Sequence, residues 1–281
     1  MNHYPSNVKE KLNSIILSMA EHHWLFSKNP GHDFTRQHLG KLSFYDTMRL
    51  IISMGKGSTN DEIMDYFNLD PDLIPSQSAF CQRRRQISLS AFEYLFSEFS
   101  SSFPSTTDKF KDHCILACDG CHVVYATNSD IIEDYNKPRL IDYKGYNHMH
   151  LNGFVDVISK AFLDVVIQPG QQPDEREALH SMLDHFTPDD PQKYIITADR
   201  GYESYDLLFH CELKNLGYVF RVKSPSSPKS ILSYYASEFP DDLEEFDVTI
   251  KRFFTDKATN IMKSQSDVYR YINPSKNTPH F

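Results

Sequence analysis

Two aspartates each follow a run of apolar residues that predicts a buried strand. Asp119 follows the run in ILACDGCHV, and Asp199 ends the segment KYIITAD. Strand ends gather at one edge of an α/β sheet, so two such carboxylates can meet there. They can then hold Mg²⁺ or Mn²⁺, and two ions about 3.5–4 Å apart stabilise both oxygens of an in-line phosphoryl transfer. The spacing alone favours a simpler alternative, in which each aspartate caps a turn, because DG and DRG are common turn sequences.

Three other groups of reactive side chains have simpler explanations. Cys118 and Cys121 form a C-x-x-C at a strand end, without the helix N-terminus of a redox pair or the second pair of a zinc ribbon, so chance spacing is expected. His148 and His150 share one face of a strand and are predicted to be surface histidines rather than zinc ligands. Glu175 lies in the first turn of a helix, where an acid complements the helix dipole.

The composition indicates a cytoplasmic protein with one large and one smaller domain. The chain has 281 residues, 40% of them hydrophobic, and its five cysteines fit reduced thiols. It has no apolar run of about 18 residues and no signal-peptide layout at its N-terminus, so no membrane partner is expected. The net charge of −9 counts against a nucleic-acid partner as a global property, although a local basic stripe can still bind DNA.

The first half of the chain predicts short helices over residues 42–103. The segment FYDTMRLIISM has a helix-period apolar face, GKGST interrupts it, and PSQSAFCQRRRQI predicts a helix capped by Ser76. Arg83, Arg84 and Arg85 lie near the end of that helix. This pattern is typical of a helix-turn-helix-like DNA reader, and the residues alone slightly favour a plain helical bundle with solvated arginines.

The second half changes to a strand period, with helices between the later strands. The predicted order is strand 115–119, strand 148–158, strand 161–167, helix, strand 193–199, helix and strand 218–223. An antiparallel hairpin followed by alternating helices and strands predicts a ribonuclease-H-like layout. Arg221 and Lys223 share a face of the last strand, where they either meet a phosphate backbone or are solvated.

Five segments, in order, resemble the DDE transposases of bacterial insertion sequences of the insertion-sequence-four type. They are ILACDGCHV, KGYNHMHLNGFVDVISKAFLDVVIQP, DEREAL, IITADRGYESYDL and YVFRVKS, and SAFCQRRRQI resembles the family's N-terminal segment. The resemblance spans roughly residues 42–223, and ADRGYES is its most specific piece. It implies that Asp119 and Asp199 are the first two catalytic carboxylates and metal ligands, with two Mg²⁺ or Mn²⁺ ions in a complete site. Water and then a DNA 3′-hydroxyl attack phosphodiesters in that chemistry.

One part of the family's pattern is missing. The third carboxylate is a glutamate on a helix beyond a mostly β insertion, in a signature containing Tyr, Arg, Glu and Lys, and we do not find it in this sequence. Glu203 follows Asp199 too closely to take its place. The expected protein is therefore a C-terminally truncated DNA transposase that is inactive alone. The alternative is a truncated DNA-binding regulator or inhibitor of transposition.

The expected class is α/β (α+β), with a ribonuclease-H-like mixed sheet behind a helical DNA-binding domain. The predicted segments are an extension (1–41), the helical domain (42–110), an incomplete catalytic core (111–223) and the start of the β-type insertion (224–281). The predicted DNA-binding residues are Arg83, Arg84, Arg85, Arg221 and Lys223. The expected partners are transposon terminal repeats and target DNA at the nucleoid; a homodimer is allowed, and no small-molecule substrate is expected.

Overall fold

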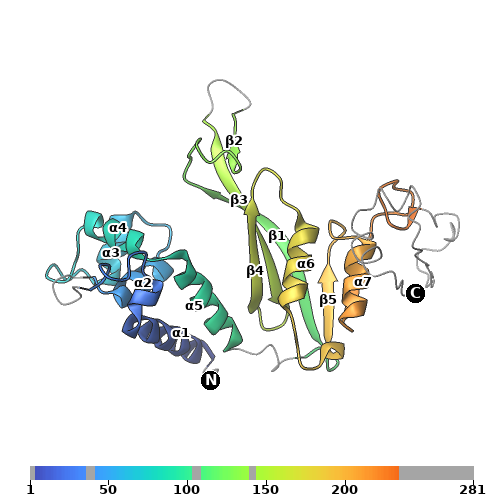
Figure 1. The fold of residues 1–281 in the computed structure, drawn as a ribbon, viewed down its shortest axis with the longest axis horizontal. Coiled ribbons are helices and arrows are strands. Elements are labelled where there is room, and N and C mark those ends of the chain that lie inside the picture. The colour runs from blue at the N-terminus through green and yellow to red at the C-terminus, as the bar shows by residue number, and fades with distance from the viewer. Residues whose placement is uncertain (1–3, 36–41, 103–108, 139–143, 234–281) are drawn as a thin grey trace. The chain divides into compact units, whose positions relative to one another are not determined.

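The computed structural model describes residues 4–35, 42–102, 109–138 and 144–233 of the chain (Figure 1). The chain divides into two compact units, Met1–Pro104 and Ser105–Phe281. Residues 234–281, most of the predicted insertion segment, lie outside the described residues. Within the described ranges, no helix is both long enough and apolar enough to cross a membrane.

The first unit is helical. Its elements are α1 (Tyr4–Glu21), η1 (His23–Phe26), α2 (Phe44–Ser53), α3 (Thr59–Tyr66), α4 (Gln77–Gln86) and α5 (Leu89–Ser101). The predicted cap is confirmed, because Ser76 Oγ accepts a hydrogen bond from the Ala79 N–H at the start of α4. Helix α1 comes from the predicted extension, and its Ile16 and Met19 are buried against Phe44 and Met48 of α2. The extension thus contributes to the core of the helical unit.

The connection between α3 and α4 differs from that of a helix-turn-helix. Ten residues, 67–76, separate the two helices, whereas the motif uses a turn of about three to four residues. Asn68 and Leu69 have φ values of 51° and 59°, which end α3 abruptly before Asp70 and Pro71. Helices α2, α3 and α4 instead surround a small core of their own; its buried members are Leu42, Leu50, Ile63 and Phe80.

The second unit contains a six-stranded mixed sheet. Its elements are β1 (Cys114–Tyr125), β2 (Tyr135–Asn136), β3 (Tyr146–Asp156), β4 (Phe162–Pro169), α6 (Glu175–His185), η3 (Pro191–Lys193), β5 (Tyr194–Ala198), α7 (Tyr205–Leu213) and β6 (Gly217–Phe220). Strand β1 pairs antiparallel with β3 and parallel with β5, which pairs parallel with β6, while β2 and β4 both pair with β3. This arrangement confirms the predicted ribonuclease-H-like mixed sheet flanked by helices.

Helices α6 and α7 run beside the sheet (Figure 1) and bury one of its faces. Alternate residues of the strands point toward the helices, as the two-residue period of a strand requires. The buried set is Leu116, Cys118, Phe154, Ile196 and Ala198 from the strands, with Ala178, Leu179, Met182, Leu183, Leu207 and Cys211 from the helices. This core fixes the strand ends against the start of α6, and that edge carries the acidic residues of the candidate site.

The position of Asp119 in its strand corrects a prediction. Asp119 does not end the strand, because β1 continues to Tyr125 in an unbroken antiparallel ladder with β3. What ends at this point is the parallel pairing with β5, whose last pair is Cys118 with Ala198. The residues after Asp119 are polar and small, so the sequence lost its strand pattern although backbone pairing continued. Asp119 therefore lies where β1 loses one of its two neighbours.

A polar chain lies inside the second unit between α6 and α7. His180 Nε2 is 2.7 Å from Asp206 Oδ2, His180 Nδ1 is 2.8 Å from His210 Nδ1, and His210 Nε2 is 3.0 Å from Asp184 Oδ1. His210 donates to Asp184 through Nε2, so its Nδ1 must accept from His180. The other nitrogen of His180, Nε2, lies against the buried Asp206 carboxylate.

The chain of histidines predicts that acid will weaken the second unit. Burial first, and then the neighbouring His180 charge, lower the pKa of His210 from 6.5 to about 4. The unfolded chain therefore binds a proton here at a higher pH than the folded chain. The resulting stabilisation is complete above pH 6.5 and is lost as the pH falls toward 4, on the order of 3 kcal/mol in total. Urea midpoints measured at pH 7.5 and 4.5 will show this loss.

The matched variant for the acid effect is His210→Gln, which keeps a polar group that does not titrate in this range. Its urea midpoint should fall less between pH 7.5 and 4.5 than that of the unaltered chain. Asp184, Asp206 and Lys214 also face this chain of groups and are left unchanged in both proteins. An equal acid effect in the two proteins would show that His210 is not responsible.

Candidate active site

The two predicted catalytic aspartates lie beside each other on neighbouring strands. Cys118 of β1 pairs with Ala198 of β5, and Asp119 and Asp199 are the next residues of the two parallel segments. Neighbouring strands are about 4.8 Å apart, so the two backbones bring these residues together. Both residues are exposed, and their Oδ1 atoms accept hydrogen bonds from the nearby Gly120 and Gly201 N–H groups at 2.9 and 2.6 Å. The register thus brings the backbones of Asp119 and Asp199 close together, while their catalytic role stays a prediction.

A third carboxylate, that of Glu175, lies at the same edge of the sheet. Glu175 is the first residue of α6, and a Cβ placed on Gly201 would be 3.0 Å from its Oε2 and 2.9 Å from Asp199 Oδ1. Only a residue without a side chain leaves this space open between the two acids. Glu175 also raises the pKa of Cys118 and of Tyr202, as does Asp119. The sequence analysis gave Glu175 only a role at the helix dipole.

The two cysteines beside Asp119 have different surroundings. Burial raises the pKa of the Cys118 thiol to about 12, so this thiol stays protonated at neutral pH. Cys121 is exposed, and residues three apart in a strand point to opposite faces. The expectation that the C-x-x-C is a chance spacing fits this geometry. The Tyr202 hydroxyl lies beside the Cys118 thiol, and burial also raises the pKa of that tyrosine.

The prediction that His148 and His150 are surface residues is wrong. Both are buried on the face of β3 that meets α6, together with Asn152 and the core residue Phe154. The ring of His122 on β1 lies 4.6 Å from that of His148 and 4.8 Å from that of His150, in edge-to-face contact. Burial lowers the pKa of His150, and the nearby Glu175 opposes this shift. The signal in the sequence for this buried face of β3 was the series of polar residues at alternate positions before Phe154.

The residues at this edge suit a divalent cation. Exposed carboxylate oxygens are the ligands that Mg²⁺ and Mn²⁺ prefer, and Gly201 keeps the space between Asp199 and Glu175 open. In the described part of the chain, no three His, Cys, Asp or Glu side chains already stand in a group that could hold an ion. A cation would therefore have to draw the carboxylates inward, and it would supply Lewis-acid chemistry at a phosphoryl oxygen.

Of the two predicted DNA-binding residues after β6, Lys223 has an acidic partner. Its Nζ lies 2.8 Å from Glu203 Oε1, and its backbone N–H donates to Glu203 Oε2 at 2.6 Å. Glu203 is buried, so the lysine neutralises a charge that would otherwise be costly. Arg221 is exposed, and its N–H donates to the Ala198 carbonyl directly before Asp199. Arg221 is therefore the better placed of the two for a phosphate near the aspartates.

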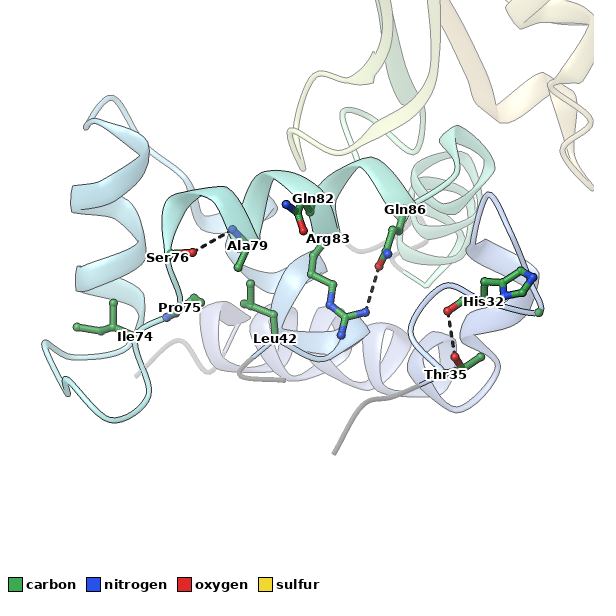
Figure 2. Close-up of a pocket in the computed structure, with 11 residues that line it drawn as sticks. His32, Thr35, Leu42, Ile74, Pro75, Ser76, Ala79, Gln82, Arg83 and Gln86 are labelled. Atoms are coloured by element: carbon green, nitrogen blue, oxygen red, sulfur yellow. Dashed lines mark hydrogen bonds between the residues drawn. The ribbon is translucent and has the colours of Figure 1, made fainter. Parts of the chain in front are cut away.

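The predicted arginines of the helical unit lie on α4 in two different settings. Arg83 lines a pocket of about 820 Å³ and donates to Gln86 Oε1 at 3.1 Å (Figure 2). Its guanidinium also lies 5.1 Å from the centre of the Phe34 ring. Arg84 and Arg85 are exposed, and Arg84 extends over the Phe80 ring.

The wall of this pocket is rich in hydrogen-bonding groups. Figure 2 shows Ser76, Gln82, Arg83 and Gln86 of the α4 segment at the pocket, with His32 and Thr35 near the far end of the helix. Gln and Arg side chains are the groups that commonly read base edges in DNA, and Ser and Thr bind bases or phosphates. The pocket side of α4 is therefore a polar surface, whereas Arg84 and Arg85 project from other sides of the helix, because consecutive helical residues point about 100° apart.

The sheet order and the paired aspartates define a protein of the ribonuclease-H-like class. The family described as the transposase DDE domain matches residues 110–275, more than half of the 281 residues. The chain therefore belongs to the DDE-domain transposases, a family that acts on DNA and generally uses divalent metal ions. A comparison with curated protein sequences finds no match.

Proposed function

We propose that this chain is a transposase of the insertion-sequence-four type and that Asp119 and Asp199 are its first two catalytic residues. The observation that carries the proposal is the parallel register that ends at Cys118 and Ala198, which sets the two aspartates side by side. The order of the sheet and the family match agree with it. Its substrates are then transposon ends and target DNA, and its site of action is the nucleoid in the cytoplasm.

The chemistry proposed for this site is hydrolysis and strand transfer at phosphodiesters. Asp119 and Asp199 would hold Mg²⁺ or Mn²⁺, which stabilises charge on the attacking and leaving oxygens. The chain's own residues supply carboxylate oxygens, while the Cys118 thiol beside Asp119 stays protonated. Arg221 is placed to meet a backbone phosphate next to Asp199.

A second candidate function is a DNA-binding regulator of transposition that binds transposon ends without cutting them. The polar surface along α4 favours it, because this surface belongs to a unit separate from the one that carries the aspartates. Incubation of end-containing DNA with the chain and Mn²⁺ separates the two candidates. Strand cleavage supports the transposase, and protection of the ends without cleavage supports the regulator.

DNA binding by α4 is tested by removing its three arginines together. Replacing Arg83, Arg84 and Arg85 by alanine should weaken binding of transposon-end DNA. Each phosphate contact that is lost should also lower the steepness of log K against log [salt] by about 0.9. Fluorescence anisotropy over a salt series measures both quantities.

The matched control removes the same charge from other parts of the helical unit. Lys9, Lys11 and Lys56 are exposed, so replacing all three by alanine changes the net charge equally. This control should keep the salt slope of the unaltered chain. Equal salt slopes for the arginine variant and the unaltered chain would show that α4 is a plain bundle helix that does not contact DNA phosphates.

A further inference from the structure

The start of α6 is fixed at the sheet edge by a chain of polar contacts. Asp174 caps the helix by accepting hydrogen bonds from the Arg176 and Glu177 N–H groups, both at 3.1 Å. The Gln168 side chain holds the Asp174 backbone from both sides, with Oε1 accepting from its N–H at 3.1 Å and Nε2 donating to its carbonyl at 2.9 Å. Glu175, the next residue, therefore leaves a backbone that is anchored to β4.

Buried polar groups of β3 face Gly120, the residue after Asp119. Asn152 is 0% exposed, donates to Gln168 Oε1 at 3.2 Å, and its Oδ1 has no hydrogen-bond partner among the described residues. This oxygen would be 3.0 Å from a Cβ on Gly120, the residue after Asp119. His150, 3% exposed, places Nε2 3.4 Å from Glu175 Oε1, and its Nδ1 also lacks a partner in the described chain. Burying a polar atom without a hydrogen bond costs free energy, so these atoms call for an explanation.

Glu175 faces Asp199 across a space that is kept open. A Cβ on Gly201 would be 2.9 Å from Asp199 Oδ1 and 3.0 Å from Glu175 Oε2, so the two carboxylates border one small volume. Two anions so close repel each other unless a cation lies between them. The Glu175 side chain is 37% exposed, which leaves it room to turn toward such a cation.

We propose that Glu175 is a metal-ligating residue of this site and shares a divalent cation with Asp199. The inference rests on the proposed function, since it adds a carboxylate to the two aspartates that the family match implies. The competing explanation is that Glu175 only complements the dipole of α6. Glu177 occupies the same helical turn and would serve the dipole equally, so it provides the matched control.

The test is Mn²⁺ binding by the whole chain, measured by isothermal titration calorimetry. Glu175→Gln should weaken binding by at least about 100-fold, because a direct ligand contributes more than an outer-shell partner, whereas Glu177→Gln should stay within about twofold of the unaltered chain. In the double variant Asp199→Asn with Glu175→Gln, the loss of binding free energy should be smaller than the sum of the two single losses, because both acids act on one ion. Equal affinities for the two glutamate variants would overturn the inference.

Two further outcomes separate this inference from the proposed function. If the unaltered chain binds no Mn²⁺, or if Asp199→Asn binds it unchanged, the metal site itself is wrong and both proposals fail. If Asp199→Asn weakens binding and Glu175→Gln does not, the proposed function stands and the role of Glu175 fails.

Melting temperatures in EDTA add a readout that does not depend on activity. Glu175→Gln should melt higher than Glu177→Gln, because it relieves the repulsion from Asp199, and it should gain less from saturating Mn²⁺ than the unaltered chain does. Two results together would count against the shared ion. Glu175→Gln would melt no higher in EDTA than Glu177→Gln, and its melting temperature would rise as much with Mn²⁺ as that of the unaltered chain.

Discussion

A chain carrying Asp199→Asn or Asp119→Asn will bind Mn²⁺ at least about 100-fold more weakly than the unaltered chain. Loss of an outer-shell partner of a metal site already costs about 10- to 100-fold, and a direct ligand contributes more. Asparagine keeps the shape of aspartate but removes the charge that a hard divalent cation requires. Metal-dependent cleavage of transposon-end DNA should disappear in the same variants, since the ions stabilise both reacting oxygens.

The aspartate variants should fold normally, and this separates lost chemistry from lost structure. Both side chains are exposed and make only local hydrogen bonds, so the melting temperature in EDTA should not fall below that of the unaltered chain. Asp190 provides a matched control. It lies before the start of β5, whereas Asp199 follows its end, and it pairs with Lys193 at the surface. Asp190→Asn should leave Mn²⁺ affinity unchanged. Unchanged affinity in both Asp119→Asn and Asp199→Asn would remove the metal site from this sheet edge.

The second large effect is expected inside the second unit, where Asp206→Ala should lower the free energy of unfolding by about 3–5 kcal/mol. Asp206 is completely buried and lies 2.7 Å from His180, which also contacts His210. Removing the carboxylate leaves the buried polar ring of His180 without its acidic partner. Urea denaturation followed by circular dichroism measures the change, with the slope of the transition as the check on two-state behaviour.

The control for Asp206 lies at the other end of the same polar chain. Asp184 also contacts a histidine, but its side chain is 67% exposed. Exposed ion pairs contribute about 0–1 kcal/mol, so Asp184→Ala should cost no more than that. A loss of less than about 1 kcal/mol for Asp206→Ala would show that the His180 charge is satisfied elsewhere or is not present.

The elements of the second unit could be predicted from local patterns. The strand and helix periods predicted the order of the main elements along the chain, and the structure confirms it and adds the short strand β2. The predicted end of β1 was wrong. Gly120, Cys121 and His122 show no apolar alternation, but their backbones still pair with β3. Pairing with a distant strand therefore decided this boundary.

Burial of the histidines could not be predicted for a similar reason. His148 and His150 look like surface residues in a single strand, and only tertiary contacts bury them: Gly170 and Asn136 lie against His148, and Glu175 of α6 lies near His150. Glu175 looked like an ordinary first-turn acid because its neighbours, Asp199 and Gly201, come from a later strand end. No spacing along the chain reports such a contact.

The sequence by itself determined the kinds of element and their order, and it singled out the two aspartates as candidate site residues. Side-chain period and turn chemistry are local properties of the chain. The tertiary structure alone decided which residues meet. The register of β1 with β5 sets Asp119 beside Asp199, and the anchored start of α6 brings Glu175 to Asp199. These contacts depend on strand order and register between segments far apart in sequence, which only the folded sheet fixes.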